Sequence, residues 1–261
     1  MAVIAVYSMK GGVGKTTLAV DLAWRFASVG ARNTLLWDLD PQAGAGFLLG
    51  FDPAPHGRAS AVFQRDGKPR QLIERTAYER LSLIPADESL RNLPGQLARL
   101  GQRQRLAQMT NLLKGDYQRI VLDCPAGLSE ISDQVIAAAD VLIVPLPASP
   151  LSARALDMLR RELVRNHRRH PPLLPVLSMY NSRRPLHRAV RQETAASWPV
   201  VPLTAALEQV AQRRAPLATF APHCDAERAL ARLWSGVEAR LQADARSAVP
   251  GKLFGAQLAP V

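Results

Sequence analysis

The sequence predicts an α/β protein built on a doubly wound, mostly parallel sheet with helices on both faces. Short continuous apolar runs, which suit parallel strands buried on both faces, alternate along the chain with segments of helical periodicity. A glycine-rich turn follows the first of these runs, and two later runs end in aspartates. Because ligands bind outside the carboxyl ends of the strands in such folds, we expect these three features to meet at one edge of the sheet.

Length and composition indicate one domain. The chain has 261 residues, of which 48% are hydrophobic and 21% charged, as in a globular protein with a substantial core. Residues 1–245 are predicted to form the domain and residues 246–261 a flexible tail. No apolar run approaches the roughly 18 to 20 residues of a membrane span, and the N-terminus has no signal-peptide layout, so a cytoplasmic protein is expected.

The positive charge is unevenly distributed. Residues 1–150 carry 16 basic and 14 acidic side chains, whereas residues 151–240 carry 15 arginines and 7 acids. Most of the formal net charge of +11 therefore lies late in the chain, which predicts a surface that meets a phosphate backbone. The alternative is that the chain is simply rich in arginine and that these side chains form a solvated surface without a ligand. A general preference for arginine, however, would not concentrate the charge in one part of the chain.

The first predicted strand, 2–7, leads into the run Lys-Gly-Gly-Val-Gly-Lys-Thr-Thr, and a helix with a regular apolar stripe is predicted at 15–29. Glycines let successive N–H groups turn toward an anion, and the positive end of the helix adds to the attraction. In such a loop Lys15 reaches the β- and γ-phosphates and Thr16 holds Mg²⁺. A glycine-rich turn without a ligand is the alternative. The predicted nucleotide contacts here are Lys10, Gly11, Gly12, Val13, Gly14, Lys15, Thr16 and Thr17.

One departure from the ordinary phosphate-loop motif makes the prediction for this loop more specific. Met9 stands where the ordinary phosphate loop has its first glycine, and a second lysine, Lys10, follows it. The run resembles the deviant Walker A motif of the ParA/MinD family of dimerising P-loop ATPases. The resemblance implies that ATP with Mg²⁺ is the dimerising ligand and that Lys10 reaches across the dimer interface to the partner's nucleotide. The alternative is that Lys10 is a solvated loop lysine.

The second predicted strand, 34–37, delivers Asp38-Leu39-Asp40-Pro41-Gln42 to the same edge of the sheet. This segment is similar to switch I of ParA proteins, which implies that Asp40 orients the attacking water and that Asp38 supports the metal region. Phosphoryl transfer needs positioning and charge stabilisation more than strong base catalysis, so these roles are chemically reasonable. As local structure alone, Asp40-Pro41 would form a turn. The predicted catalytic residues are Lys10, Lys15 and Asp40.

The middle of the chain predicts several helices and strands but contains few candidate functional residues. The glycine-rich segment at 44–50 is expected to complete switch I, and its mobility would communicate the nucleotide state. A Pro/His/Gly loop at 52–57 follows. The remaining predictions are helical turns near 62–63 and 72–73, a strand at 81–84, and helices at 87–99 and 103–114 that serve packing and dimer geometry.

The next predicted strand, 117–123, ends in Asp123, as in a Walker B motif. A carboxylate at a strand tip beside the phosphate loop can hold Mg²⁺, usually through water. ParA proteins commonly continue with two prolines, whereas here Pro125 is followed by Ala126, which leaves the switch II backbone less constrained. Cys124 is expected to be a small packing residue. The predicted metal site consists of Thr16, Asp38 and Asp123.

The rest of the chain alternates further helices and strands. The loop at 180–184 resembles the family's segment near the adenine base, so Asn181 is the predicted base contact. Leu203 and Gln209 stand where the family often has arginine and glutamate, so the DNA-binding assignments rest on charge. The predicted elements are helices at 129–139, 147–166, 186–196, 204–214 and 225–243 and strands at 141–145, 173–179 and 200–202. The candidate DNA-binding residues are Arg183, Arg184, Arg188, Arg191, Arg213, Arg214, Arg228 and Arg232.

The resemblance spans the whole predicted domain and implies a ParA-like partitioning or positioning ATPase without an N-terminal helix-turn-helix extension. ATP would close a homodimer that binds nucleoid DNA without sequence preference, and slow hydrolysis, stimulated by a ParB-like partner, would release it. A MinD-like protein would instead bind a membrane, but Lys252-Leu253-Phe254 in the tail offers weak affinity, so a membrane partner is not expected. An ATP-dependent ligase is a third reading. An iron–sulfur reductase would need two suitably placed cysteines, and Cys124 already stands at the Walker B strand tip.

Overall fold

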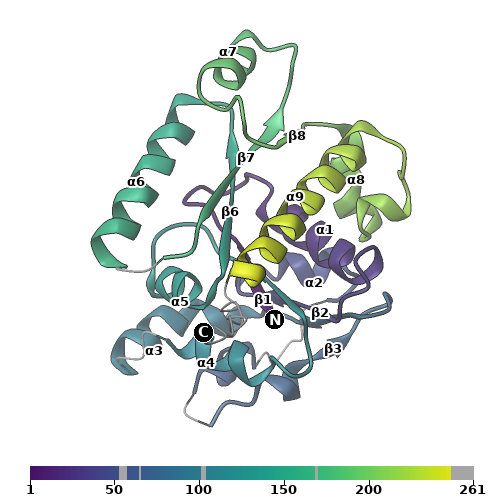
Figure 1. Ribbon diagram of the computed structural model, residues 1–261. Coiled ribbons are helices and arrows are strands. Elements are labelled where there is room, and N and C mark those ends of the chain that lie inside the picture. The colour runs from purple at the N-terminus through teal and green to yellow at the C-terminus, as the bar shows by residue number, and fades with distance from the viewer. Residues whose placement is uncertain (53–57, 65, 101–103, 168–169, 248–261) are drawn as a thin grey trace, which may run out of the picture.

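The computed structural model describes residues 1–52, 58–64, 66–100, 104–167 and 170–247 (Figure 1). The strands are β1 (Ala2–Val6), β2 (Thr34–Asp38), β3 (Glu74–Arg75), β4 (Leu81–Ile84), β5 (Arg119–Asp123), β6 (Val141–Pro147), β7 (Leu173–Tyr180) and β8 (Val200–Pro202). The helices are α1 (Lys15–Ser28), α2 (Gly44–Leu48), α3 (Leu93–Leu100), α4 (Arg105–Leu112), α5 (Glu130–Ala138), α6 (Pro150–Asn166), α7 (Pro185–Glu193), α8 (Ala205–Arg213) and α9 (Asp225–Ser247). Short 3₁₀ turns lie at Ala59–Phe63, Pro69–Leu72, Glu88–Asn92 and Leu217–Thr219.

These strands form one sheet in the order β3-β4-β2-β5-β1-β6-β7-β8. Every pairing is parallel except that of β3 with β4, at one edge. The doubly wound, mostly parallel fold predicted from the sequence is therefore confirmed. β1 lies near the centre, between β5 and β6, and its carboxyl end carries the glycine-rich loop.

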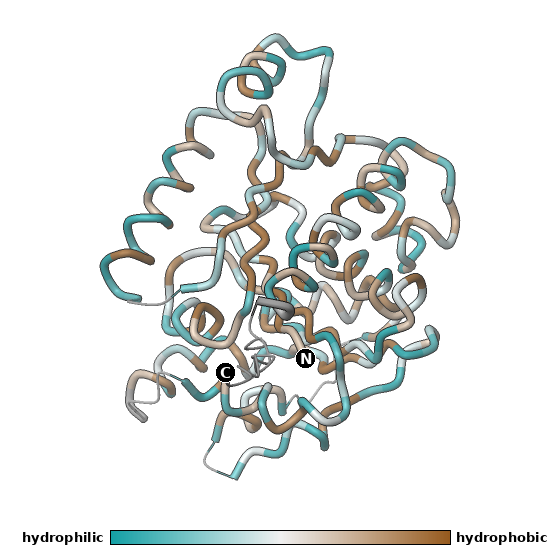
Figure 2. The backbone as a smooth tube through the Cα atoms, viewed as in Figure 1, coloured by the Kyte–Doolittle hydropathy of each residue, from teal (hydrophilic) through white to brown (hydrophobic). Residues whose placement is uncertain are grey.

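Alternate side chains of the central strands enter two separate cores. Val3 and Ala5 pack with α3, α4, α5 and α6 on one face, whereas Ile4 and Val6 pack with α1, α2, α8 and α9 on the other. In Figure 2 the apolar strands lie between helices in which hydrophilic and hydrophobic residues alternate. Burial on both faces explains why the strands read as continuous apolar runs.

The helix α9 is anchored by partly buried ion pairs. Arg25 of α1 contacts Asp21 at 2.6 Å and Glu227 of α9 at 3.1 Å. Further along α9, Glu238 contacts Arg119 of β5 at 2.8 Å. These charged pairs fix α9 against both the sheet and the helix that follows the glycine-rich loop.

Several elements differ from prediction in extent or were not predicted. β6 continues to Pro147 because it pairs with β7 up to Ser178, and α9 continues to Ser247, beyond the predicted end at 243. The strand β3 and the helix α2 were not predicted. Of the predicted tail, residues 248–261 lie outside the described residues. None of the described helices is long and apolar enough to cross a membrane.

Candidate functional site

The glycine-rich loop joins β1 to α1 through two left-handed residues, Gly12 (φ 67°) and Gly14 (φ 86°). A Cβ atom added at either position would meet no atom within 4 Å, so the backbone conformation, and not crowding, requires glycine there. No side chain caps the first turn of α1. Its N–H groups are therefore available to an anion at the positive end of the helix.

The loop forms one wall of a cleft of about 480 Å³ at the carboxyl edge of the sheet. The predicted switch I residue Asp40 lies on this cleft, and so do Pro125 and Ala126, which follow β5. Three segments far apart in the sequence thus meet where the topology predicts a ligand. The full lining is Gly11, Gly12, Val13, Gly14, Lys15, Thr16, Thr17, Asp40, Gln42, Pro125 and Ala126.

The two lysines of the loop occupy different environments. Lys15 is 7% exposed, and its ammonium donates a hydrogen bond to the backbone carbonyl of Lys10 at 3.3 Å. Lys10 is half-buried and does not line the cleft, and within the described residues its ammonium has no ion-pair partner. Lys15 is therefore placed for a phosphate in this chain's own cleft, and Lys10 is not.

Asp38 is buried, and its carboxylate accepts backbone hydrogen bonds from the predicted switch I segment. One carboxylate oxygen accepts the N–H of Asp40 at 3.0 Å, and the other accepts the N–H groups of Ala45 at 2.9 Å and Gly46 at 3.4 Å. Burial raises the pKa of Asp38 to about 7, despite the lowering effect of these hydrogen bonds. These three N–H donors let the Asp38 carboxylate fix the shape of the loop that follows β2.

Asp123 lies beside Asp38 in the sheet register and is also fully buried. Neither of its carboxylate oxygens has a hydrogen bond of normal geometry among the described residues. Burial, followed by the charge of Asp38, raises the pKa of Asp123 well above 3.8, although Thr16 and Lys15 oppose the shift. An unpaired buried carboxylate near a threonine hydroxyl fits a hard divalent cation such as Mg²⁺.

Asp40 is half-buried at the mouth of the cleft. Its Oδ1 atom accepts the N–H of Gln42 at 3.0 Å, and its carbonyl accepts the N–H of Ala43 at 2.8 Å. The local turn suggested by Asp40-Pro41 is therefore present, together with a position on the cleft. The turn places Asp40 among the residues that line the cleft.

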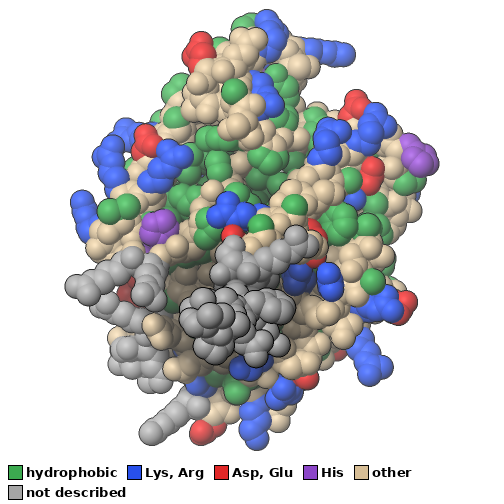
Figure 3. All heavy atoms as spheres, viewed as in Figure 1, with side chains coloured by type: hydrophobic (Ala, Val, Ile, Leu, Met, Phe, Trp, Pro, Cys, Tyr) green, Lys and Arg blue, Asp and Glu red, His purple; other side chains and the backbone are tan. Residues whose placement is uncertain are grey.

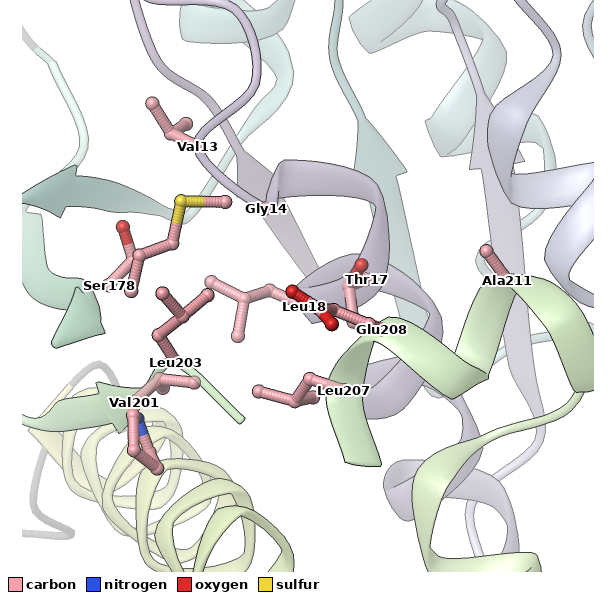
Figure 4. Close-up of a pocket in the computed structure, with 12 residues that line it drawn as sticks. Val13, Gly14, Thr17, Leu18, Ser178, Val201, Leu203, Leu207, Glu208 and Ala211 are labelled. Atoms are coloured by element: carbon pink, nitrogen blue, oxygen red, sulfur yellow. The ribbon is translucent and has the colours of Figure 1, made fainter. Parts of the chain in front are cut away.

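A second, mostly apolar pocket of about 260 Å³ adjoins the loop and shares Val13, Gly14 and Thr17 with the cleft (Figure 4). Leu18, Leu203 and Leu207 point into it. A polar cleft joined to an apolar pocket matches a nucleotide with its phosphates in one and its base in the other. The other lining residues are Ser178, Met179, Val201, Pro202, Glu208 and Ala211.

The base contact predicted from the sequence, Asn181, does not line this pocket, and the pocket itself was not predicted. The side-chain oxygen of Asn181 accepts the N–H of Arg183 at 2.9 Å, and its own N–H donates to Nδ1 of His187 at 3.0 Å. The available signal was that β7 and β8 end at the same edge as β1. Residues such as Leu18 and Leu207 carry no motif that would single them out.

The candidate DNA-binding arginines fall into two groups. One follows β7 and continues along α7, and the other belongs to α8 and α9; basic side chains over these helices are separate in the view of Figure 3. Six of the eight are exposed, whereas Arg191 and Arg214 are half-buried. Arg191 donates to the carbonyl of Trp198 at 2.9 Å, and Arg214 to that of Phe47 at 3.0 Å. Those two guanidinium groups are therefore already engaged within the fold.

Comparison with known sequences places these features in context. A family model described as an AAA domain matches residues 1–173. The chromosome partitioning protein ParA of Myxococcus xanthus is 33% identical over 159 residues, which span 60% of this chain and 56% of that protein. The chromosome-partitioning ATPase Soj of Thermus thermophilus is 30% identical over 249 residues, which span 92% of this chain and 96% of that protein.

Solved structures share the fold. Apo McdA from Cyanothece superposes with a TM-score of 0.78 at 23% identity and covers 92% of this chain and 99% of its own. Cobyrinic acid a,c-diamide synthase from Mycobacterium smegmatis, solved with a bound ATP analogue and magnesium, has a TM-score of 0.78 at 26% identity and covers 94% of this chain and 96% of its own.

Proposed function

Because the chain belongs to the ParA/Soj family of P-loop ATPases, we propose that it is a partitioning or positioning ATPase whose ATP-bound homodimer binds DNA without sequence preference. The observation that carries this proposal is the position of Lys10. Its backbone carbonyl holds the Lys15 ammonium, while its own side chain lies outside the lining of the chain's cleft. A lysine so placed is suited to reach the nucleotide of a second copy.

The cleft residues have separate roles in ATP hydrolysis. Lys15 and the N–H groups of the loop bind the β- and γ-phosphates, and Asp40 orients the attacking water. Thr16 and Asp123 would hold Mg²⁺, with Asp38 fixing the adjacent loop. When bound, Mg²⁺ would neutralise charge on the phosphates. The apolar pocket around Leu18 would hold the base.

Hydrolysis serves as a timer in this proposal. The ATP dimer binds the nucleoid through arginines of the basic segment, and a ParB-like partner stimulates an otherwise slow hydrolysis that releases it. The charge of residues 151–240 supports the DNA step, since nonspecific binding depends on phosphate neutralisation.

The test compares the wild type with Lys10→Ala in ATP, ADP and no nucleotide, by sedimentation and by binding to unrelated duplexes at low salt. We expect ATP-dependent dimers and DNA binding for the wild type only. Lys114→Ala, which removes an exposed lysine outside the cleft, is the matched control and should behave like the wild type. Normal dimers of Lys10→Ala would contradict the cross-dimer role, and a wild type that ignores DNA would contradict the DNA step.

The similarity to the synthase favours an ATP-dependent ligase as the second candidate. A ligase would turn over ATP only with an added small-molecule acceptor. Turnover that responds to DNA and a partner protein, without such an acceptor, supports the partitioning function instead.

A further inference from the structure

The segment that follows β5 is held by two hydroxyl groups from different elements. The carbonyl oxygen of Gly127 accepts a hydrogen bond from the Tyr7 hydroxyl at 2.8 Å and another from the Ser132 hydroxyl at 3.0 Å. Tyr7 directly follows β1 and precedes the glycine-rich loop, whereas Ser132 lies in the first turn of α5. One carbonyl therefore joins three parts of the molecule.

This carbonyl lies next to the cleft wall. Pro125 and Ala126 line the cleft, and Gly127 follows them with a φ of 95°, a left-handed conformation that favours glycine. Ala126 is exposed, so packing holds this part of the wall only weakly. A short segment with an exposed alanine and a glycine has little stiffness of its own. Hydrogen bonds from outside the segment must therefore limit its motion.

The donors themselves are rigidly placed. Tyr7 is 1% exposed within the core under α5, and its N–H donates to the carbonyl of Ile143 in β6 at 2.9 Å. Ser132 is 3% exposed, and its hydroxyl oxygen also accepts the N–H of Ser129 at 2.9 Å in the cap of α5. Burial raises the pKa of Tyr7 to about 12, so its hydroxyl stays a donor at every pH of interest.

We infer that Tyr7 and Ser132 are positioning residues for ATP hydrolysis, because they fix the Pro125–Gly127 wall of the cleft through the Gly127 carbonyl. Neither residue lines the cleft. The inference rests on the proposed ATPase function and adds residues outside the motifs of the phosphate loop, switch I and Asp123. The hydrogen bond from Tyr7 also connects the start of the phosphate loop with the segment that follows β5.

Tyr7→Phe tests this directly because it keeps the ring and removes only the hydroxyl. We expect turnover at saturating ATP to fall about tenfold, with half-saturation by ATP changed less than about twofold, since a misplaced wall affects the transition state more than ground-state binding. Amide hydrogen exchange at 126–129 in the nucleotide-free protein should accelerate by about tenfold while that of β5 is unchanged. Ser132→Ala should act in the same direction.

Tyr117→Phe is the matched control: Tyr117 precedes β5, at the amino ends of the strands, and its hydroxyl makes no hydrogen bond within the described residues. It should change neither turnover nor exchange at 126–129.

Unchanged turnover in Tyr7→Phe, or unchanged exchange at 126–129, would overturn the inference. Exchange that rises equally throughout the protein would also overturn it, since it would indicate a general loss of stability. A wild-type protein without ATP turnover would contradict the proposed function. Hydrogen exchange at 126–129 would still test whether the Tyr7 hydroxyl holds this segment.

Discussion

Asp123 combines complete burial with two carboxylate oxygens that lack hydrogen bonds within the described part of the chain. Its neighbour Asp38, equally buried, has three N–H donors. The two carboxyl groups are adjacent across β2 and β5, so ionising both in the absence of a cation is costly. The nucleotide-free protein therefore carries a local instability that a bound cation would relieve.

We predict that Asp123→Asn stabilises the nucleotide-free protein at pH 8 by about 1–2 kcal/mol, because it removes a buried, poorly paired charge. The sign follows from the raised pKa: an acid of this kind favours the folded state below its ordinary value of 3.8 and loses that contribution as pH rises through the raised value. The gain should therefore be smaller at pH 5. Urea denaturation at both pH values measures it.

The same variant should lose the extra stability that Mg²⁺ and ATP together give the wild type, because one of the candidate ligands is gone. An Asp123→Asn protein less stable than the wild type at pH 8 would contradict this account. So would a variant that responds normally to Mg²⁺ with ATP.

At the scale of elements, α9 is attached to the sheet by a charged contact that responds to acid. Glu238 contacts Arg119 at 2.8 Å and Arg32 at 3.5 Å, and its side chain is 12% exposed. Although burial alone would raise the pKa of Glu238, hydrogen bonds from Gln242 and Arg119 and the charges of both arginines lower it overall. A carboxyl group with a lowered pKa stabilises the fold above its ordinary value of 4.5 and loses that effect as pH falls.

We predict that Glu238→Gln lowers the free energy of unfolding by about 1–2 kcal/mol at pH 7, since it weakens charged hydrogen bonds that are partly open to solvent. The difference from the wild type should shrink as the pH falls below 4.5 and vanish once Glu238 is protonated in the folded protein. Glu79→Gln, at an ion pair whose glutamate is 82% exposed, is the control and should be neutral. A difference that persists unchanged at pH 3 would mean that charge is not the cause.

The elements that sequence could predict are those whose signal is local. The apolar runs of the central strands and the stripe of α9 appear in the sequence because each is buried along a regular period. β3 has only two residues, both exposed, and so lacks any pattern. α2 reads Gly-Ala-Gly-Phe-Leu, a poor helix by propensity, and its first N–H groups are satisfied by the distant carboxylate of Asp38. That contact exists only after β2 is in place.

The same distinction applies to the site. The phosphate loop and Asp40 were predicted because backbone conformation and chemistry restrict the residue types there, and the structure gathers them around one cleft. The apolar pocket could not be predicted, because Leu18, Ser178 and Leu203 are ordinary residues brought together by β7, β8 and α1. The roles of Asn181 and of the individual arginines stay predictions.

At the scale of the whole molecule, the charge is divided between the two halves of the chain. The nearly balanced residues 1–150 supply the phosphate loop, switch I and Asp123, while the basic residues 151–240 supply α7, α8 and most of α9. Arg183 and Arg184 are exposed at the start of α7 and have no ion pair among the described residues. They are therefore available to a phosphate backbone.

We predict that Arg183→Ala with Arg184→Ala weakens ATP-dependent DNA binding and makes the slope of log affinity against log salt shallower by about 2, one for each lost phosphate contact. The control removes the same charge from the other half, with Arg75→Ala and Arg91→Ala, both exposed. Titrations of one duplex at several salt concentrations give the slopes. Equal effects of the two pairs would indicate general charge attraction without a binding surface on α7.

The strand order also has a consequence for how the chain is made. Among the strands of this sheet β1 comes first in the chain, but its sheet neighbours β5 and β6 begin only at Arg119 and Val141. At typical rates of synthesis the run Ala2–Val6 waits on the order of ten seconds for a partner. During that time an apolar segment that will become one of the two central strands lacks its sheet partners, so shielding of this segment would favour correct folding.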